Sequence, residues 1–184
     1  MLYTRKGDKG TTKTFGCDQR ISKSSIIAEA LGSLDEINSF LGFCKIKAKK
    51  EKLSVSRDIA VDQTIHNIQK NLFIIQAELA GASMSIDEGR VKEMETVIDA
   101  IEKQLPPIKT FFISGGIELA SIFDIARTIS RRAERRVVEV FEEGKTPVNK
   151  FTLAYLNRLS SILYAFARLT NHRAGITEKS PDYK

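Results

Sequence analysis

The sequence has 184 residues, of which 42% are hydrophobic and 28% are charged, with a net charge of +6. This length predicts a single domain, residues 1–184, that folds without disulfides or a structural metal. The opening residues, MLYTRKGDKG, have no apolar run behind their basic residues, and no later stretch reaches the roughly 20 apolar residues of a membrane span. Cys17 and Cys44 fit neither a disulfide framework nor a zinc pattern. We therefore expect a cytoplasmic protein with no secretory signal and no membrane segment.

Residues 1–23 predict an irregular arm, because Gly, Thr and Lys alternate there without a helical or strand period. Glycines let backbone N–H groups approach an anion, lysines supply charge and threonines supply hydroxyls, so the arm is a candidate phosphate-binding segment. Asp8 is suited to help hold a hydrated Mg²⁺ beside phosphates. The spacing does not match a Walker A loop, and a disordered basic tail is the alternative interpretation.

Five helices are predicted in residues 24–175 from apolar residues spaced three or four apart. They cover about 24–47, 54–83, 87–104, the stretch from Gly116 to about Glu143, and about 148–173. Pro106 and Pro107 end the third helix, while Gly144 and Gly175 are the expected stops of the fourth and fifth. The short links predict an all-α fold, a five-helix antiparallel bundle, followed by a loose tail over 176–184.

The densest charge pattern lies in the fourth helix, in the segment ARTISRRAERR. Arg127, Arg131 and Arg135 are spaced i, i+4 and i+8, so their guanidinium groups share one narrow stripe. A triphosphate would neutralise this stripe, because the planar guanidinium matches phosphate oxygens. A solvated face with screened charges, partly balanced by Glu134 and Glu139, explains the same pattern.

Two weaker signals lie in the fifth and first helices. A polar line with spacings of four, three, four and three borders an apolar face, and is either a contact surface or the wet side of the helix: Asn157, Ser161, Tyr164, Arg168 and Asn171. Asp35 is a poor residue for a helix interior, so it either faces water or has a partner. His66 and His172 are solitary, and no Ser/His/Asp set or Cys/His pair indicates nucleophilic catalysis.

Together, five segments resemble the PduO-type ATP:cob(I)alamin adenosyltransferases in the order and spacing of that family: YTRKGDKGTTKTFG (3–16), EALGSLDEINSFLGF (29–43), FFISGG (111–116), ARTISRRAERRVV (126–138) and YLNRLSSILYAFAR (155–168). The resemblance implies transfer of the 5′-deoxyadenosyl group of ATP to the cobalt of cob(I)alamin, giving adenosylcobalamin and triphosphate. It also implies homotrimers with sites between subunits, and a reductase or a cobalamin-dependent mutase as a candidate partner.

The resemblance also implies roles for individual residues. The ATP-binding arm of the family matches Thr4, Arg5, Lys6, Gly7, Thr12, Lys13 and Lys23. Its later ATP contacts match Arg131, Arg132, Glu134, Arg135 and Asn157. Arg127 and Arg131 take catalytic roles, and the partner of Arg127 across the subunit boundary matches Asp35. The aromatic residue that helps displace the lower axial ligand of cobalamin matches Phe112.

Two positions depart from the family pattern. The family turn is usually ILPGG, where this chain has Ile113, Ser114, Gly115 and Gly116. Family members often have His where this chain has Asp124. Both departures concern the expected cobalamin side rather than the ATP side.

The chemistry implied by the resemblance requires no nucleophile or general base from the protein, because Co(I) attacks the 5′ carbon directly and triphosphate leaves. The protein must position the substrates and stabilise the leaving group, tasks that suit the arginine stripe, the lysine arm and Mg²⁺. Two alternatives are a non-catalytic carrier of cobalamin and ATP, and a basic helical nucleic-acid-binding protein. No helix-turn-helix signal or stacking aromatics support the second, so we expect no nucleic-acid partner.

Overall fold

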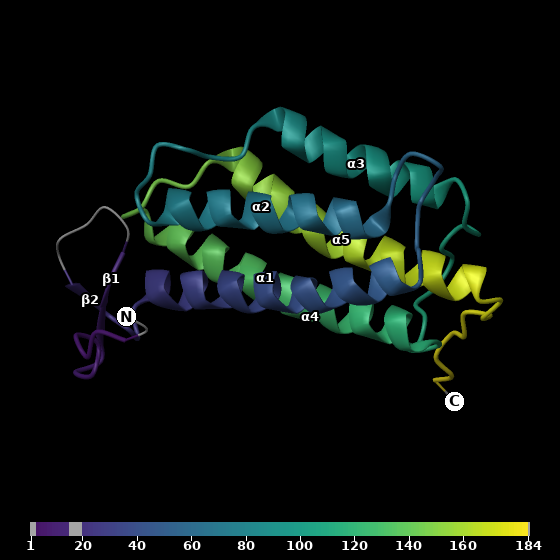
Figure 1. Cartoon of the computed structure of the whole chain (residues 1–184), viewed down its shortest axis with the longest axis horizontal. Coiled ribbons are helices and arrows are strands. Elements are labelled where there is room, and N and C mark those ends of the chain that lie inside the picture. The colour runs from purple at the N-terminus through teal and green to yellow at the C-terminus, as the bar shows by residue number, and fades with distance from the viewer. Residues whose placement is uncertain (1–2, 15–19, 184) are drawn as a thin grey trace.

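The computed structural model describes residues 3–14 and 20–183, and within them five helices form an antiparallel bundle (Figure 1). The helices are α1 (Ile26–Lys50), α2 (Val61–Leu79), α3 (Glu88–Glu102), α4 (Glu118–Glu143) and α5 (Lys150–Arg173). Successive helices run in opposite directions. α4 packs between α1 and α5, while α2 lies against α1 and α3 against α5. The predicted all-α bundle is confirmed.

Local capping determines where most helices begin and end. The side chains of Ser25, Asp87 and Asn149 accept hydrogen bonds from backbone N–H groups in the first turns of α1, α3 and α5. Gly144 ends α4 in the left-handed conformation, with φ of 72°, as predicted. Such caps satisfy backbone groups that helix ends leave without partners, and so fix the length of each helix.

The predicted start of the second helix, at residue 54, is wrong. Ser54 and Ala60 pair in an isolated antiparallel bridge, and Val55 N–H donates to the carbonyl of Ile59 at 2.7 Å. The chain therefore turns back before α2 begins at Val61. The predicted end at residue 83 is also too late, because α2 stops at Leu79.

The arm is not wholly irregular, which corrects the prediction that it contains no strand. Strands β1 (Thr11–Lys13) and β2 (Arg20–Ser22) form a two-stranded antiparallel sheet. Arg20 supports it by donating to Thr11 Oγ1 at 2.8 Å and to the Lys6 carbonyl at 2.6 Å. The pair of strands stands beyond the end of the bundle where α1 begins and α4 ends (Figure 1). Gly16 and Cys17 lie outside the described residues.

The apolar faces of the helices form one core. Phe123 of α4 and Phe166 of α5, both fully buried, contact each other with ring centroids 5.4 Å apart. At one end of the core, the buried carboxylate of Glu78 accepts hydrogen bonds from Asn149 N–H at 2.6 Å and from Thr152 Oγ1 at 2.5 Å. These bonds join the end of α2 to the start of α5. No helix in the described part of the chain is both long and apolar enough to cross a membrane.

The first residues of the C-terminal tail are held in place, in contrast to the predicted loose tail. Ile113 N–H donates to the Lys179 carbonyl at 2.8 Å. Glu178 forms an ion pair with Arg168 of α5 at 2.6 Å. The tail therefore lies against the long loop between α3 and α4.

Candidate active site

Two cavities meet at the loop between α3 and α4. The tail cavity, of about 480 Å³, is lined by this loop, by α5 and by the C-terminal tail. The aromatic cavity, of about 340 Å³, lies between the same loop, α4 and α5, and its lining includes Phe111, Phe112, Arg127 and Arg131. Phe112 lines both cavities, so its half-buried side chain forms part of the wall between them.

A third cavity continues along α4 and α5, away from the loop. This arginine cavity, of about 410 Å³, is lined by Arg131, Glu134, Arg135 and Asn157, with Val138, Glu139 and Glu142. Arg131 lines both the aromatic and the arginine cavity. The structure thus places four predicted ATP residues, Arg131, Glu134, Arg135 and Asn157, on a surface that continues to the predicted cobalamin residue Phe112.

The polar line of α5 follows this surface, which favours the contact-surface interpretation over a merely wet helix side. Asn157 lines the arginine cavity, Ser161 the aromatic cavity, and Tyr164 both the aromatic and the tail cavity. Arg168 and Asn171 line the tail cavity. Partial burial raises the pKa of the Tyr164 phenol, so Tyr164 is a neutral donor or acceptor at this surface at physiological pH.

Arg127 has an ion-pair partner within its own helix, besides the partner across the subunit boundary that the resemblance implies. Its Nε lies 3.2 Å from Oδ1 of Asp124, one turn earlier. Its guanidinium also lies 5.8 Å from the centroid of the Tyr164 ring. The Asp124 side chain is only 12% exposed, so the ion pair is partly shielded from water and holds Arg127 toward α5.

The other four arginines of α4 divide between two faces. Arg132 forms an ion pair with Glu36 of α1, and Arg136 with Glu139 at 2.9 Å. Arg131 and Arg135, which are exposed, form no ion pair with any residue that the structure describes. The positive charge available to a ligand is therefore concentrated at the arginine cavity. Pairing of Arg132 and Arg136 with carboxylates of the same chain disfavours a nucleic-acid-binding face.

Asn157 is held at both ends of its amide. Its Nδ2 donates to Glu134 at 2.9 Å, and its Oδ1 accepts from Arg158 at 2.8 Å. Arg158 in turn donates to Glu95 of α3 at 2.8 Å. This network fixes the orientation of Asn157 before any ligand binds, which lowers the entropic cost of binding.

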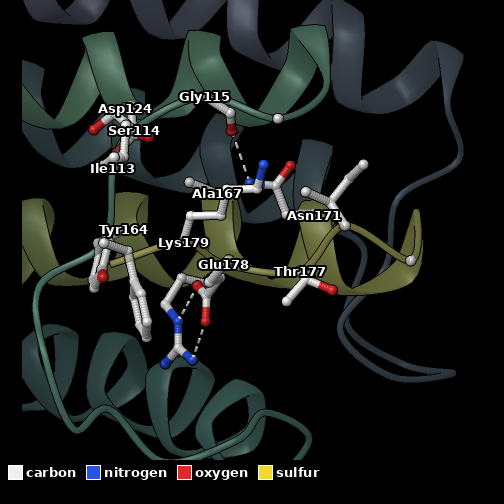
Figure 2. Close-up of a pocket in the computed structure, with 15 residues that line it drawn as sticks. Ile113, Ser114, Gly115, Asp124, Tyr164, Ala167, Asn171, Thr177, Glu178 and Lys179 are labelled. Carbon is white, nitrogen blue, oxygen red and sulfur yellow. Dashed lines mark hydrogen bonds and ion pairs between the residues drawn. The ribbon is translucent and has the colours of Figure 1, made fainter. Parts of the chain in front are cut away.

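The glycine turn before α4 is shaped by Asn171. Gly116 has φ of 99°, and a Cβ there would lie only 2.2 Å from Asn171 Oδ1. The Asn171 amide donates to the Gly115 carbonyl at 2.8 Å and accepts from Ile117 N–H at 3.2 Å. Figure 2 shows this contact across the tail cavity, with Glu178 and Lys179 of the tail nearby. The absence of a side chain at Gly116 therefore lets Asn171 of α5 pack closely against the loop.

The arm lies at the opposite end of the bundle from the loop and tail (Figure 1). Lys23 stands beside Gly7, since a Cβ at Gly7 would lie 3.1 Å from Lys23 Nζ. The arm residues of the predicted ATP site are thus gathered with one another, but one chain does not bring them to Phe112: Thr4, Arg5, Lys6, Gly7, Thr12, Lys13 and Lys23. Asp35 is exposed on α1, and the described contacts of Arg127 do not include it.

Sequence reasoning missed three contributors to the site region. Arg20 organises the arm, and nothing in the spacing of the arm indicated this. Glu178 pairs with Arg168 across a turn of the chain, a contact that no helical spacing predicts. The pairing of Asp124 with Arg127 follows the i, i+3 rule and was accessible from the sequence.

The sequence profile of the cobalamin adenosyltransferases matches residues 2–170 of the chain. The chain belongs to the cobalamin adenosyltransferase family. Within this family it is 38% identical over 179 residues to the corrinoid adenosyltransferase of Bacillus subtilis, covering 95% of this chain and 89% of that protein. It is 39% identical over 180 residues to the corrinoid adenosyltransferase PduO of Citrobacter freundii, covering 94% of this chain but only 50% of that longer protein.

A solved adenosyltransferase structure is also similar. It is a variant of the PduO-type ATP:corrinoid adenosyltransferase from Lactobacillus reuteri, complexed with cobalamin and ATP. The TM-score is 0.87 at 30% identity, and the match covers 100% of this chain and 97% of that chain. The bundle described above is therefore that of the PduO-type adenosyltransferases.

Proposed function

We propose that this chain transfers the 5′-deoxyadenosyl group of ATP to the cobalt of cob(I)alamin, giving adenosylcobalamin and triphosphate. The observation that carries the proposal is the continuity of the site at Arg131. On one side of Arg131 lies a cavity with the aromatic residues Phe111 and Phe112, and on the other lies the arginine cavity. The aromatic surface suits the flat corrin ring and the arginine surface suits the triphosphate, and the reaction needs the two next to each other. Family membership and the similar structure with both ligands support the proposal.

The geometry suggests how the residues act. The Co(I) electron pair forms the Co–C bond at the 5′ carbon of ATP as the C5′–O bond breaks, so negative charge grows on the leaving triphosphate. Arg131 and Arg135 make no ion pair among the described residues, so their guanidinium groups can stabilise the negative charge on the triphosphate. Arg127 is held by Asp124 and lines the aromatic cavity, where it would help to orient the bound corrinoid. Donors already in place at the growing charge lower the barrier without reorganisation.

The proposal includes a homotrimer with sites between subunits. In one chain the arm lies at the far end of the bundle from Phe112, and the family resemblance implies that the arm of a neighbouring subunit completes the ATP site. The same contact would place Asp35 beside Arg127 of the neighbour. Arg132 would exchange its ion pair with Glu36 for a phosphate oxygen. Mg²⁺ would arrive with ATP, and Asp8 of the arm would help to hold it beside the phosphates.

The proposal further includes a cytoplasmic location and a partner that supplies reduced cobalamin or uses the product, such as a reductase or a cobalamin-dependent mutase. These parts rest on the family resemblance. The arrangement of the cavities supports the reaction itself but does not bear on them.

The decisive experiment mixes protein, Mg-ATP and chemically reduced cob(I)alamin, and follows the absorbance spectrum for a Co–C bond that light then cleaves. The second product should be intact triphosphate rather than phosphate and pyrophosphate. Protein that binds both ligands without this spectral change would be a carrier, and the proposed activity would be wrong.

A further inference from the structure

Arg168 is a charged side chain in the buried part of α5, with only 6% of its surface exposed. A buried guanidinium is costly unless ionic and hydrogen-bonding partners surround it. Here Glu178 accepts from Nε at 2.6 Å and from an Nη at 2.8 Å, while the Pro106 carbonyl accepts from that same Nη at 2.9 Å. The close carboxylate raises the pKa of Arg168, so the side chain remains charged.

The Arg168 guanidinium lies over the Phe112 ring, with 5.4 Å between its central carbon and the ring centroid. Phe112 sits in a loop of turns and extended residues between α3 and α4. The loop is tied to α5 through Pro106 and Gly115, and to the tail through Ile113. Arg168 therefore connects the ring itself to α5, while Asn171 and Lys179 hold the loop on the C-terminal side of the ring.

We propose that Arg168 and Glu178 are positioning residues for Phe112. The tail carboxylate orients the guanidinium, and the guanidinium over the ring holds Phe112 where it lines both the tail and the aromatic cavity. This inference rests on the proposed function and on the role that the family resemblance implies for Phe112, displacement of the lower axial ligand of cobalt. Glu178 lies beyond residues 2–170, the stretch that the family profile matches, so a residue outside the profile would act on the corrinoid site.

The oxidation state of cobalt separates this role from a structural one. Co(II) in cobalamin carries an axial ligand that must leave before reduction, whereas Co(I) has already lost it. A misplaced Phe112 ring should therefore impair the reaction that starts from cob(II)alamin and leave the reaction of pre-reduced cob(I)alamin intact. General damage to the fold would impair both reactions equally.

The test compares Glu178→Gln with a matched control, Glu88→Gln, in the full-length protein. Glu88 forms an ion pair of 2.7 Å with Lys92 on α3, away from the cavities. Each protein is assayed with Mg-ATP and either cob(II)alamin plus dihydroflavin as reductant, or cob(I)alamin reduced beforehand. Losing the charge from a bidentate, charge-assisted pair should slow the first reaction by about tenfold or more. The second reaction and the KM for ATP should stay within about twofold of wild type, and Glu88→Gln should match wild type in both.

A spectroscopic measurement checks the cause directly. With ATP bound, the fraction of cob(II)alamin in the four-coordinate state, measured by electron paramagnetic resonance, should fall in Glu178→Gln and not in Glu88→Gln. Arg168→Lys, which keeps the charge but lacks the planar face, should show the same loss if its circular dichroism and melting curve match wild type.

Each outcome decides. Selective loss from Co(II) supports the inference, while equal loss in both reactions, or no loss in either, overturns it. A folded Arg168→Lys protein with wild-type Co(II) activity would also overturn it. If wild-type protein fails to adenosylate pre-reduced cob(I)alamin, the proposed function itself is wrong, and the inference is overturned together with it.

Discussion

Replacing Arg131 by alanine tests the leaving-group role at the junction of the aromatic and arginine cavities. Arg131 is exposed and forms no ion pair within the described part of the chain, and alanine favours helix more strongly than arginine. We therefore expect a change of no more than about 0.5 kcal/mol in the free energy of unfolding. Loss of one donor to the growing charge costs about 3–4 kcal/mol in the transition state, so kcat should fall by roughly 10²–10³.

The assay uses saturating Mg-ATP and pre-reduced cob(I)alamin, so that only adenosyl transfer is measured. Arg136→Ala is the matched control, because Arg136 lies on the same helix but pairs with Glu139 and faces α1 through Glu29. Its kcat should stay within about twofold of wild type, since exposed ion pairs contribute little. A kcat for Arg131→Ala within about threefold of wild type, with unchanged circular dichroism, would refute the leaving-group role.

Three further predictions follow from the arm, the proposed subunit contact and the core. Mg-ATP should slow tryptic cleavage of the arm severalfold, because its Gly/Thr/Lys sequence has little apolar surface to hold it; equal cleavage would contradict this. Asp35→Asn should impair activity less than Arg127→Ala, because Asp124 still pairs with Arg127, and the exchange Asp35→Arg with Arg127→Asp should recover part of it. Strict additivity in that double-mutant cycle, or an active monomer by mass, would exclude the contact. Burial raises the pKa of Cys44 to about 12, so at pH 8 its protonated thiol should react with a thiol reagent only after unfolding in a Cys17→Ser background; rapid labelling of the native protein would contradict this.

Helical periodicity predicted the bundle because each long helix buries a continuous apolar face. Ile65, Ile68, Leu72 and Ile75 recur at helical spacing along α2, and all four are buried. The strands of the arm were missed because each has only three residues, too few for an alternating pattern to be recognised. The region 54–60 was assigned to a helix because its turn is stabilised by backbone pairing, which leaves no periodic trace in the sequence.

The position of the arginine stripe could be predicted from the sequence, but which arginines are free of ion pairs, and so able to bind a ligand, could not. Spacing placed Arg127, Arg131 and Arg135 on one face, and the structure confirms that they line neighbouring cavities. The ion pair between Arg132 and Glu36 depends on how α1 packs on α4, and residue spacing within one helix cannot reveal that packing. The ion pair of Arg168 with Glu178 likewise depends on the path of the tail after α5.

A single uninterrupted helix, α5, carries residues that line the cavities at both ends of the candidate site, so its length fixes the distance between these cavities. Asn157 at the arginine cavity and Asn171 at the tail cavity are separated by fourteen residues, or about 21 Å of helix rise. A residue inserted between them would turn one end by about 100° against the other, so the polar line of α5 could no longer face both cavities. Under the proposed function, the length of α5 between Asn157 and Asn171 therefore sets how far apart the two reactants can bind.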